Sequence, residues 1–232
     1  MSGDILAGIV RYIGGKERLL PFIEQTIRAH GVTGGTFVDL FAGTTAVGRH
    51  FKRLGFRVVS NDLMRYSYVL GKAYIENSDV PQFAGLDICG SVSQLSMLAD
   101  NTRRLREVLA HLNAMEPVAG YVYSTYSYDG TKDTDTVRMF FTGVNAGRID
   151  AIRTQIEAWH GDGRITESEY YVLLASLIEA VPSVSNTSGT YAAFLKFWES
   201  RNQKPLTLDV PAVGGHAGRR KLCFACDTAL TG

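Results

Sequence analysis

Apolar positions in the first third of the chain mark two short strands with a helix between them. The first strand runs from Thr36 to Leu40 and leads into a turn that contains glycine, after which the residues follow a helical pattern. About twenty residues later, the stretch Val58 to Asp62 marks a second strand. A strand, a turn, a helix and a second strand in this order predict an α/β fold with a parallel sheet of the Rossmann type.

Helical spacing dominates the middle of the chain. The run Thr166-Glu-Ser-Glu169 has the capping-box pattern that starts a helix, here Tyr170 to Ala180, and we expect Pro182 to close it. Two further stretches place apolar residues at intervals of three and four, as one face of a helix requires. They are Leu95, Leu98, Leu105, Val108, Leu109 and Leu112, and then Ile149, Ile152, Ile156 and Trp159.

This change of pattern predicts three segments. Residues 1–100 form the N-terminal part of the sheet domain, residues 101–212 form a mainly helical insertion, and residues 213–232 supply a return strand to the sheet. Inside the insertion, the tyrosine-rich run Tyr121 to Tyr128 leaves two interpretations open. Tyrosines two apart could line one face of a strand or offer stacking platforms, and packing is the use that we favour for most of them.

Composition and charge argue against several classes of protein. The net charge is +1, so binding to nucleic acid would need a local basic patch. The sequence has no run of about 18 apolar residues, which argues against a membrane span. Its first residues lack the pattern of a secretory signal. The 3 cysteines, an odd and low number, favour a reducing compartment, and we expect a cytoplasmic protein.

Cys223 and Cys226 form a Cys-x-x-Cys pair. A structural zinc site needs about four ligands, and the sequence offers no second pair nearby. A redox pair would normally lie at the start of a helix. The run Leu222 to Cys226 instead suits a buried strand, so we interpret the two cysteines as buried thiols and predict no metal site.

Two motifs near the N-terminus indicate a nucleotide-type cofactor. The first strand ends in Asp39 and the turn Phe41 to Thr45, and the second strand ends in Asp62. A tight turn, a helix N-terminus and a carboxylate for ribose hydroxyls form the plan of such a site in a doubly wound sheet. Earlier, Arg11-Tyr-Ile-Gly-Gly-Lys16 has glycines that let backbone approach a ligand closely. By itself this run also suits an ordinary turn before an amphipathic helix.

The order of these pieces resembles the alpha class of DNA adenine methyltransferases, the family of the bacterial GATC adenine methylase. Thr45 stands where the Phe-x-Gly-x-Gly turn of SAM methyltransferases has its last glycine. The resemblance implies S-adenosylmethionine (SAM) as cofactor, double-stranded DNA as substrate, and methyl transfer to the exocyclic amine of adenine. By position it implies these cofactor-binding residues: Tyr12, Gly14, Lys16, Asp39, Phe41, Gly43, Asp62, and Asp227 after the third strand.

The same resemblance makes the insertion the target-recognition region. Small polar residues, a glycine and an aromatic residue between Ser185 and Lys196 could lie against a phosphate backbone and reach base edges. The alternative is a polar loop that enters an amphipathic helix. A basic face could also include Arg148, Arg153, Arg164, Arg201 and Lys204. The expected DNA-binding residues are Ser185, Asn186, Thr187, Ser188, Thr190, Tyr191 and Lys196.

The catalytic turn of this family, Asp/Asn-Pro-Pro-Tyr/Phe, is absent from the sequence. None of the 6 prolines is adjacent to another. We therefore expect no catalytic residue here, and we interpret the chain as the N-terminal portion of a methyltransferase that needs a complementary polypeptide. Without a fourth strand, the segment Thr36 to Leu40 would form an exposed apolar edge of the sheet.

Two other functions stay open from the sequence. One is a non-catalytic subunit that binds SAM or DNA, or an inactive remnant of an enzyme. The other is a different Rossmann-like enzyme that uses a nucleotide. The Gly-Gly-Lys turn and Thr45 both argue against this last function, because dinucleotide binding favours glycine near the pyrophosphate.

Overall fold

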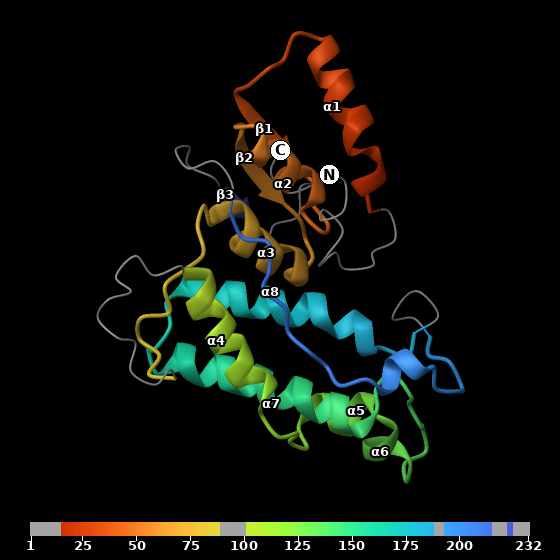
Figure 1. Ribbon diagram of the computed structural model, residues 1–232. Helices are drawn as coiled ribbons and strands as arrows, with labels where there is room; N and C mark the ends of the chain where they lie inside the picture. The colour runs from red at the N-terminus through yellow and green to blue at the C-terminus, as the bar shows by residue number, and fades with distance from the viewer. Residues whose placement is uncertain (1–14, 89–100, 188–192, 215–221, 225–232) are drawn as a thin grey trace. The chain divides into compact units, whose positions relative to one another are not determined.

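The chain forms two compact units in a computed structural model that describes residues 15–88, 101–187, 193–214 and 222–224 (Figure 1). Among the described residues, the first unit, here called the sheet unit, comprises 15–80, 212–214 and 222–224. The second, called the helical unit, comprises 81–88, 101–187 and 193–211.

The sheet unit contains a three-stranded parallel sheet, as the sequence predicts. Its strands are β1 (Thr36–Asp39), β2 (Arg57–Asn61) and β3 (Leu222–Phe224), in the order β1-β2-β3. The register pairs Phe37 with Val58 and Ser60 with Cys223. The parallel strands therefore end together at one edge of the sheet, where Asp39 and Asn61 lie.

Helices cover one face of this sheet. They are α1 (Leu20–Ala29), which follows the short helix η1 (Glu17–Leu19), α2 (Ala46–Arg53), α3 (Arg65–Gly71) and the π-helix η2 (Lys72–Glu76). Phe37 and Val58 point to this face, where the Phe37 ring stacks on Phe51 with ring centroids 4.0 Å apart. The core consists of buried Val47, Phe51, Phe56, Val58 and Ile75, with Leu20, Ile23 and Ile27 of α1 packed against it.

Two glycines allow close packing in this unit. A Cβ on Gly48 of α2 would lie 3.1 Å from Ser60 Oγ, so glycine lets the helix approach β2 closely. A Cβ on Gly71 would overlap Cys223 Sγ, so the end of α3 packs directly on β3. Both contacts fix helices at the carboxyl half of the sheet.

The opposite face of the sheet is open over the described residues. Val38 and Val59 are paired in the register and point to that face, and Val38 is 54% exposed. Within the described sheet, β1 is an outer strand, and its burial alternates between exposed and half-buried positions. The predicted apolar edge at Thr36 to Leu40 therefore corresponds to β1 and to exposed Leu40 after it.

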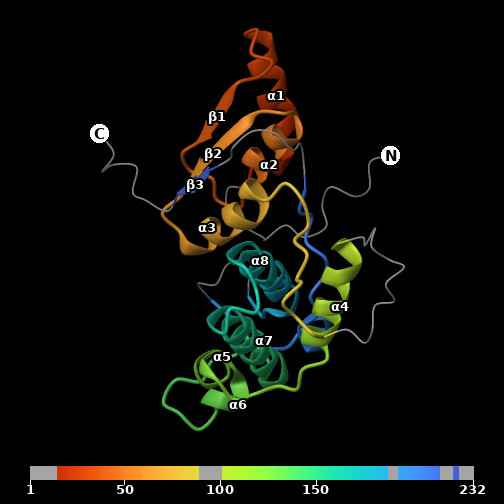
Figure 2. The same cartoon turned by 90° about the vertical axis from the view of Figure 1, so that its left-hand side faces the viewer.

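The helical unit is built around two long helices, α7 (Gly143–Gly161) and α8 (Glu167–Val184), which lie side by side in both views (Figures 1 and 2). The helix α4 (Asn101–Asn113) packs on α7. Three short helices complete the unit, α5 (Tyr121–Tyr126), α6 (Tyr128–Thr131) and η4 (Ser200–Gln203). The predicted stripes are confirmed from Leu105 onward, while Leu95 and Leu98 lie outside the described residues.

The capping box at the start of α8 is confirmed. The Thr166 side chain accepts a hydrogen bond from Glu169 N, and the Glu169 carboxylate accepts one from Thr166 N. The helix ends later than predicted, because Pro182 lies inside its last turn. A proline at this position has no N–H to donate to the carbonyl four residues earlier, and the helix ends two residues after it, at Val184.

Of the interpretations left open for the tyrosine-rich run, a strand face is wrong. The run that begins at Tyr121 is helical, because Asp150 of α7 accepts hydrogen bonds from the N–H groups of Gly120, Val122 and Tyr123 and so caps α5. The helical unit also includes the described segment 81–88, which precedes the predicted insertion. Buried Phe83 donates its N–H to Glu169, which ties the segment 81–88 to α8.

Asparagine side chains hold the extended segment 202–208 against the helices. Asn145 on α7 donates to the carbonyls of Asn202 and Lys204, at 3.1 and 2.9 Å, and accepts from Leu206 N at 2.9 Å. Asn113 brackets Leu208 in the same way, with bonds of 3.0 and 2.8 Å to its carbonyl and N–H. The segment thus has defined backbone partners although it forms no strand.

Among the described helices, none combines the length and the apolar character that spanning a bilayer requires.

Candidate cofactor site and DNA-contact segment

The turn after β1 has the left-handed backbone that the motif requires. Gly43 has φ 51° and Thr45 has φ 63°. Glycine adopts this conformation freely, but for a β-branched residue such as threonine it is an outlier that costs roughly 1–3 kcal/mol. The structure therefore explains why glycine is expected at position 45 and shows that threonine takes the same conformation.

Asp62 fixes this turn from the end of β2. Its Oδ2 accepts a hydrogen bond from Gly43 N at 2.8 Å, and its Oδ1 accepts one from Met64 N at 2.9 Å. Ala42 N donates to Asn61 O at 3.0 Å, which extends the link between the two strands beyond the sheet. Each carboxylate oxygen retains capacity to accept a further hydrogen bond.

Asp39 lies beneath the first turn of α2 and near Lys16. Its carboxyl accepts hydrogen bonds from the backbone of Phe41 and Gly48. Burial raises the pKa of this carboxyl above its ordinary value, and the negative charge of Asp62 adds to this, while the positive charge of Lys16 opposes it. The structure thus brings together Lys16, Asp39, Gly43 and Asp62.

Three buried polar atoms at this place have no hydrogen-bond partner among the described residues. They are Asp39 Oδ2, Thr45 Oγ1 and Ser60 Oγ. Thr45 and Ser60 are fully buried, and Asp39 is the register partner of Ser60. Buried polar groups are normally paired, so a cluster of three that are not indicates a site that a ligand or bound water completes.

The structure says less about the other residues that the sequence predicts to bind the cofactor. The side chain of Phe41 is 69% exposed beside the turn. Tyr12, Gly14 and Asp227 lie outside the described residues. Phe224 O accepts from Asp62 N at 3.3 Å, so β3 runs toward the same edge as far as it is described.

Sequence reasoning missed a link between the two N-terminal motifs. Thr44 Oγ1 donates to Glu17 Oε1 at 3.2 Å, which ties the start of the first helix to the turn. A second link joins α1 to α2, because His50 Nε2 lies 2.7 Å from Glu24 Oε2. In the sequence, the one sign of these two links is that Glu17 and Glu24 lie on the amphipathic helix next to the Gly-Gly-Lys motif.

Cys223 is a half-buried free thiol in β3. Burial raises its pKa to about 12, and the charge of nearby Glu76 adds to the effect. A thiol with so high a pKa is a poor nucleophile and metal ligand. Cys226 lies outside the described residues, and among the described ones no three His, Cys, Asp or Glu side chains gather as metal ligands.

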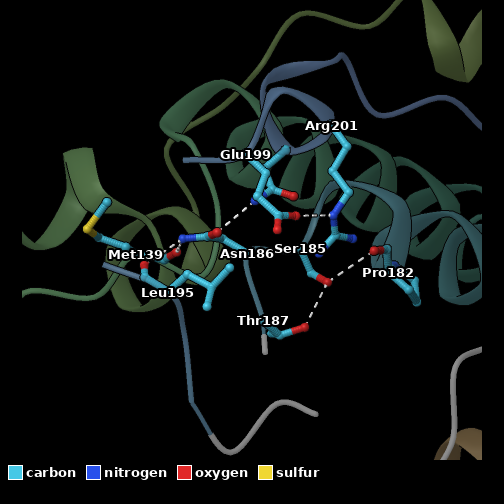
Figure 3. Close-up of polar contacts among 9 residues, drawn as sticks. Met139, Pro182, Ser185, Asn186, Thr187, Leu195, Glu199 and Arg201 are labelled. Atoms are coloured by element: carbon cyan, nitrogen blue, oxygen red, sulfur yellow. Dashed lines mark hydrogen bonds and ion pairs between the residues drawn. The ribbon is translucent and has the colours of Figure 1, made fainter. Parts of the chain in front are cut away.

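In the segment predicted to contact DNA, Asn186 points into the helical unit (Figure 3). It is fully buried, its amide donates to Met139 O and Leu195 O at 3.0 and 2.8 Å, and its Oδ1 accepts from Asn202 at 2.7 Å. Ser185 is also buried and donates to Pro182 O. These side chains hold the base of the loop closed rather than extending from it.

The outer part of this segment begins at Thr187. Thr187 is half-buried and forms an isolated antiparallel bridge with Phe194, while Lys196 is exposed. Ser188, Thr190 and Tyr191 lie outside the described residues. Thr187 and Lys196 therefore stay candidates for DNA contact, and so do the three residues not described.

Several arginines of the predicted basic face already have partners in the helical unit. Arg153 pairs with Glu157, Arg201 pairs with Glu199 at 2.6 Å, and Arg148 donates to Asn113 O at 2.5 Å. Residues 81–211 contain fifteen acids against eleven lysines and arginines. Acidic side chains of the same unit therefore neutralise part of the predicted basic face.

The comparison with known families decides the ancestry of the chain. Residues 12–212 match the D12 class N6 adenine-specific DNA methyltransferase family. The chain belongs to this family. The prediction of a DNA adenine methyltransferase lineage is therefore confirmed, and members of the family use SAM as the methyl donor.

Three relatives give the extent of the likeness. Modification methylase StsI of Streptococcus sanguinis is 41% identical over 86% of this chain and 28% of its own length. Modification methylase LlaI of Lactococcus lactis subsp. lactis is 42% identical over 86% and 29%. Type II methyltransferase M.NlaIII of Neisseria lactamica is 35% identical over 86% and 53%. The chain thus spans between about a quarter and a half of these relatives. No solved structure matches it significantly.

Proposed function

We propose that this chain supplies the SAM-binding and DNA-recognition parts of an adenine-specific DNA methyltransferase. The reaction transfers a methyl group from SAM to the exocyclic amine of adenine. The observation that carries the proposal is the left-handed turn around Gly43, whose N–H donates to Asp62 at the end of β2, in a D12-class sequence.

The groups around this turn fit the chemical parts of SAM. Asp62 can accept hydrogen bonds from ribose hydroxyls while it keeps its two backbone donors. Lys16 carries the charge that suits the carboxylate of the methionine part, and Asp39 carries the charge that suits its ammonium group. The partnerless atoms Asp39 Oδ2 and Thr45 Oγ1 support a site that is completed by a polar ligand.

When bound, SAM supplies an electrophilic methyl group on a sulfonium. The chain's own residues bind and orient it: Asp62 and the backbone of the turn fix its position, and Lys16 and Asp39 fix its charged end. The Gly43 and Thr45 backbone conformations let the main chain approach the ligand without a Cβ in the way at Gly43.

The acceptor side of the reaction needs groups beyond those described here. We assign DNA contact to the helical unit through Thr187, Lys196 and the residues between them. We further propose that a strand bearing the Asp/Asn-Pro-Pro turn, from another polypeptide or another part of the protein, pairs with the outer strand β1. The names of the relatives support a modification enzyme of a restriction system.

Calorimetric titration of the full chain with SAM tests the cofactor half of this proposal. We expect saturable binding that weakens roughly ten- to a hundredfold in Asp62→Ala, because a charged acceptor and the anchor of the turn are lost together. Asp79→Ala is the matched control, since Asp79 is an exposed acid of the same unit. No binding by a folded chain, or equal binding by Asp62→Ala, would contradict the proposal.

Duplex DNA binding and methylation test the other half. The chain should bind adenine-containing duplex DNA, and methylate it only when a polypeptide with the catalytic turn is added. DNA binding without methylation in that mixture would favour the alternative of a non-catalytic DNA-binding subunit.

A further inference from the structure

The helical unit contains an apolar cavity next to the segment that Asn186 holds. Its volume is about 380 Å³, which is within the range of sites that bury small ligands. The lining residues come from α5, α7, α8 and the segment between α6 and α7, and none carries a charge. They are Val122, Tyr126, Phe140, Phe141, Ile149 and Val181.

Aromatic rings with fixed orientations form part of its wall. Tyr126 and Phe140 meet edge to face with centroids 5.9 Å apart, and Phe140 meets Phe194 in the same way at 5.0 Å. The backbone of Phe140 is also held, because its carbonyl accepts from Asn186 N at 2.8 Å. The loop base described above therefore fixes the wall of this cavity.

A cation lies beside the aromatic wall. The Arg138 guanidinium is 5.8 Å from the centroid of the Tyr126 ring, and its Nη1 donates to Thr125 O at 3.0 Å. Arg138 N in turn donates to Thr131 Oγ1 at 2.8 Å, which fixes the start of this side chain. Flat aromatic walls next to an arginine favour a planar aromatic ligand that carries negative charge nearby, as a nucleotide does.

Charge provides a separate reason for such a contact. The excess of acids in residues 81–211 opposes binding to phosphates by this unit. Stacking of bases on aromatic rings can offset this repulsion. It contributes roughly 1–3 kcal/mol of binding free energy per base and does not depend on net charge.

We propose that this cavity accepts one unpaired base of the DNA strand, which stacks on Tyr126 and meets Phe140 edge to face, while Arg138 contacts the adjoining phosphate. The inference rests on the proposed function, because it takes DNA as the substrate. It adds a base-binding site in the helical unit that is separate from the residues expected to read base edges.

A duplex with a single bulged 2-aminopurine, compared with the fully paired duplex, tests this site in the full chain. We expect about tenfold tighter binding of the bulged duplex by fluorescence anisotropy, with quenching of 2-aminopurine fluorescence on binding. Tyr126→Leu should abolish the preference and leave binding of the paired duplex within about threefold. Arg138→Gln should lower the slope of affinity against salt by about one phosphate.

A second variant, which fills the cavity, tests whether the preference for the bulged duplex is lost for a reason other than loss of folding. Val122→Trp keeps both aromatic walls but occupies the cavity, so it should also abolish the preference. Tyr170→Leu is the control, because Tyr170 stacks on His160 and does not line the cavity. Far-UV melting curves establish that each variant is folded.

Each outcome separates this inference from the proposed function. Duplex binding with no preference for the bulge, or with a preference that survives in folded Tyr126→Leu and Val122→Trp, overturns the base site and leaves the function standing. Absence of all DNA binding overturns both.

Discussion

The turn around Gly43 in the sheet unit and the segment 202–208 in the helical unit are each held by one side chain, but the polar atoms around the two differ in how many have partners. In both, a side chain reaches across the fold to hold backbone groups: Asp62 holds Gly43 and Met64, and Asn145 holds three groups of the segment 202–208. Around the turn, however, Asp39 Oδ2 and Thr45 Oγ1 remain without partners. Asn145 uses both its donors and its acceptor.

This difference separates a scaffold from a binding site. A buried amide with all its partners inside the protein stabilises one arrangement of the chain. Buried polar atoms without partners cost stability, and a ligand or bound water can supply what is missing where several gather, as Asp39 Oδ2, Thr45 Oγ1 and Ser60 Oγ do beside the turn. Two such atoms also lie in the described part of the helical unit, Arg148 Nε and Asn202 Oδ1. Asn186 belongs to the first group, although the sequence places it among residues that could contact DNA.

Replacing Asn145 should have the largest effect on stability. Asn145→Ala leaves the buried Leu206 N and two carbonyls without partners, so we expect the free energy of unfolding to fall by about 3 kcal/mol. Urea denaturation measures this. Asn113→Ala, at a half-buried position, should cost less. If Asn145→Ala also weakened SAM binding more than about twofold, the separation of scaffold and site would be wrong.

A methyl group at Gly71 should have the next largest effect. The added Cβ would overlap Cys223 Sγ, so Gly71→Ala should destabilise the sheet unit by about 2 kcal/mol. Thermal unfolding measures the change. The double variant with Cys223→Ala removes the sulfur and should recover most of the loss, and an equal loss in the double variant would contradict this contact.

Asp39→Asn should change how stability depends on pH. Because the pKa of Asp39 is raised in the folded state by burial, its carboxyl contributes stability below its unfolded pKa and loses this contribution as pH rises through the folded value. Asparagine has no such titration. The variant should therefore be more stable than the wild type at pH 7, by less than the Gly71 effect, and its unfolding should show a smaller pH dependence in the acid range.

The same variant should bind SAM more weakly, because the charge that we propose to face the ammonium group is gone. Higher stability with weaker binding is the combination that identifies a functional, unsatisfied group. Unchanged affinity for SAM would instead indicate that Asp39 only accepts hydrogen bonds from the backbone near the start of α2.

Thr45→Gly should have the smallest effect on stability. Glycine relieves the left-handed strain but increases the entropy of the unfolded chain, so the free energy of unfolding should change by less than about 1 kcal/mol. We expect SAM affinity to fall two- to tenfold, because the partnerless hydroxyl is removed. Titration of the variant beside the wild type measures this, and tighter binding would contradict a role for the hydroxyl.

The sequence predicts the parts of this protein that depend on local order. The strands β1 and β2, the turn between Asp39 and Thr45, the capping box at Thr166 and the long helices all follow from spacing and turn chemistry. The position of Asp62 beside the turn could be predicted because parallel strands end at the same edge of a sheet.

The features that sequence reasoning missed depend on contacts between distant residues. The helix at Tyr121 forms because Asp150, almost thirty residues later, caps it. Asn186 resembles a DNA-contacting residue in a polar loop, and only its bonds to Met139, Leu195 and Asn202 place it inside. Thr45 stands at a position where the motif has glycine. Sequence preference at such a position does not indicate that the threonine hydroxyl is buried without a partner among the described residues.

Amide hydrogen exchange with and without saturating SAM tests the central claim most directly. The account predicts that SAM slows exchange in the turn and at the end of β2, residues 41–64, and leaves the amides of α7 and of the segment 202–208 unchanged. Protection confined to the helical unit, or no protection in residues 41–64, would contradict the assignment of the incomplete turn as the cofactor site.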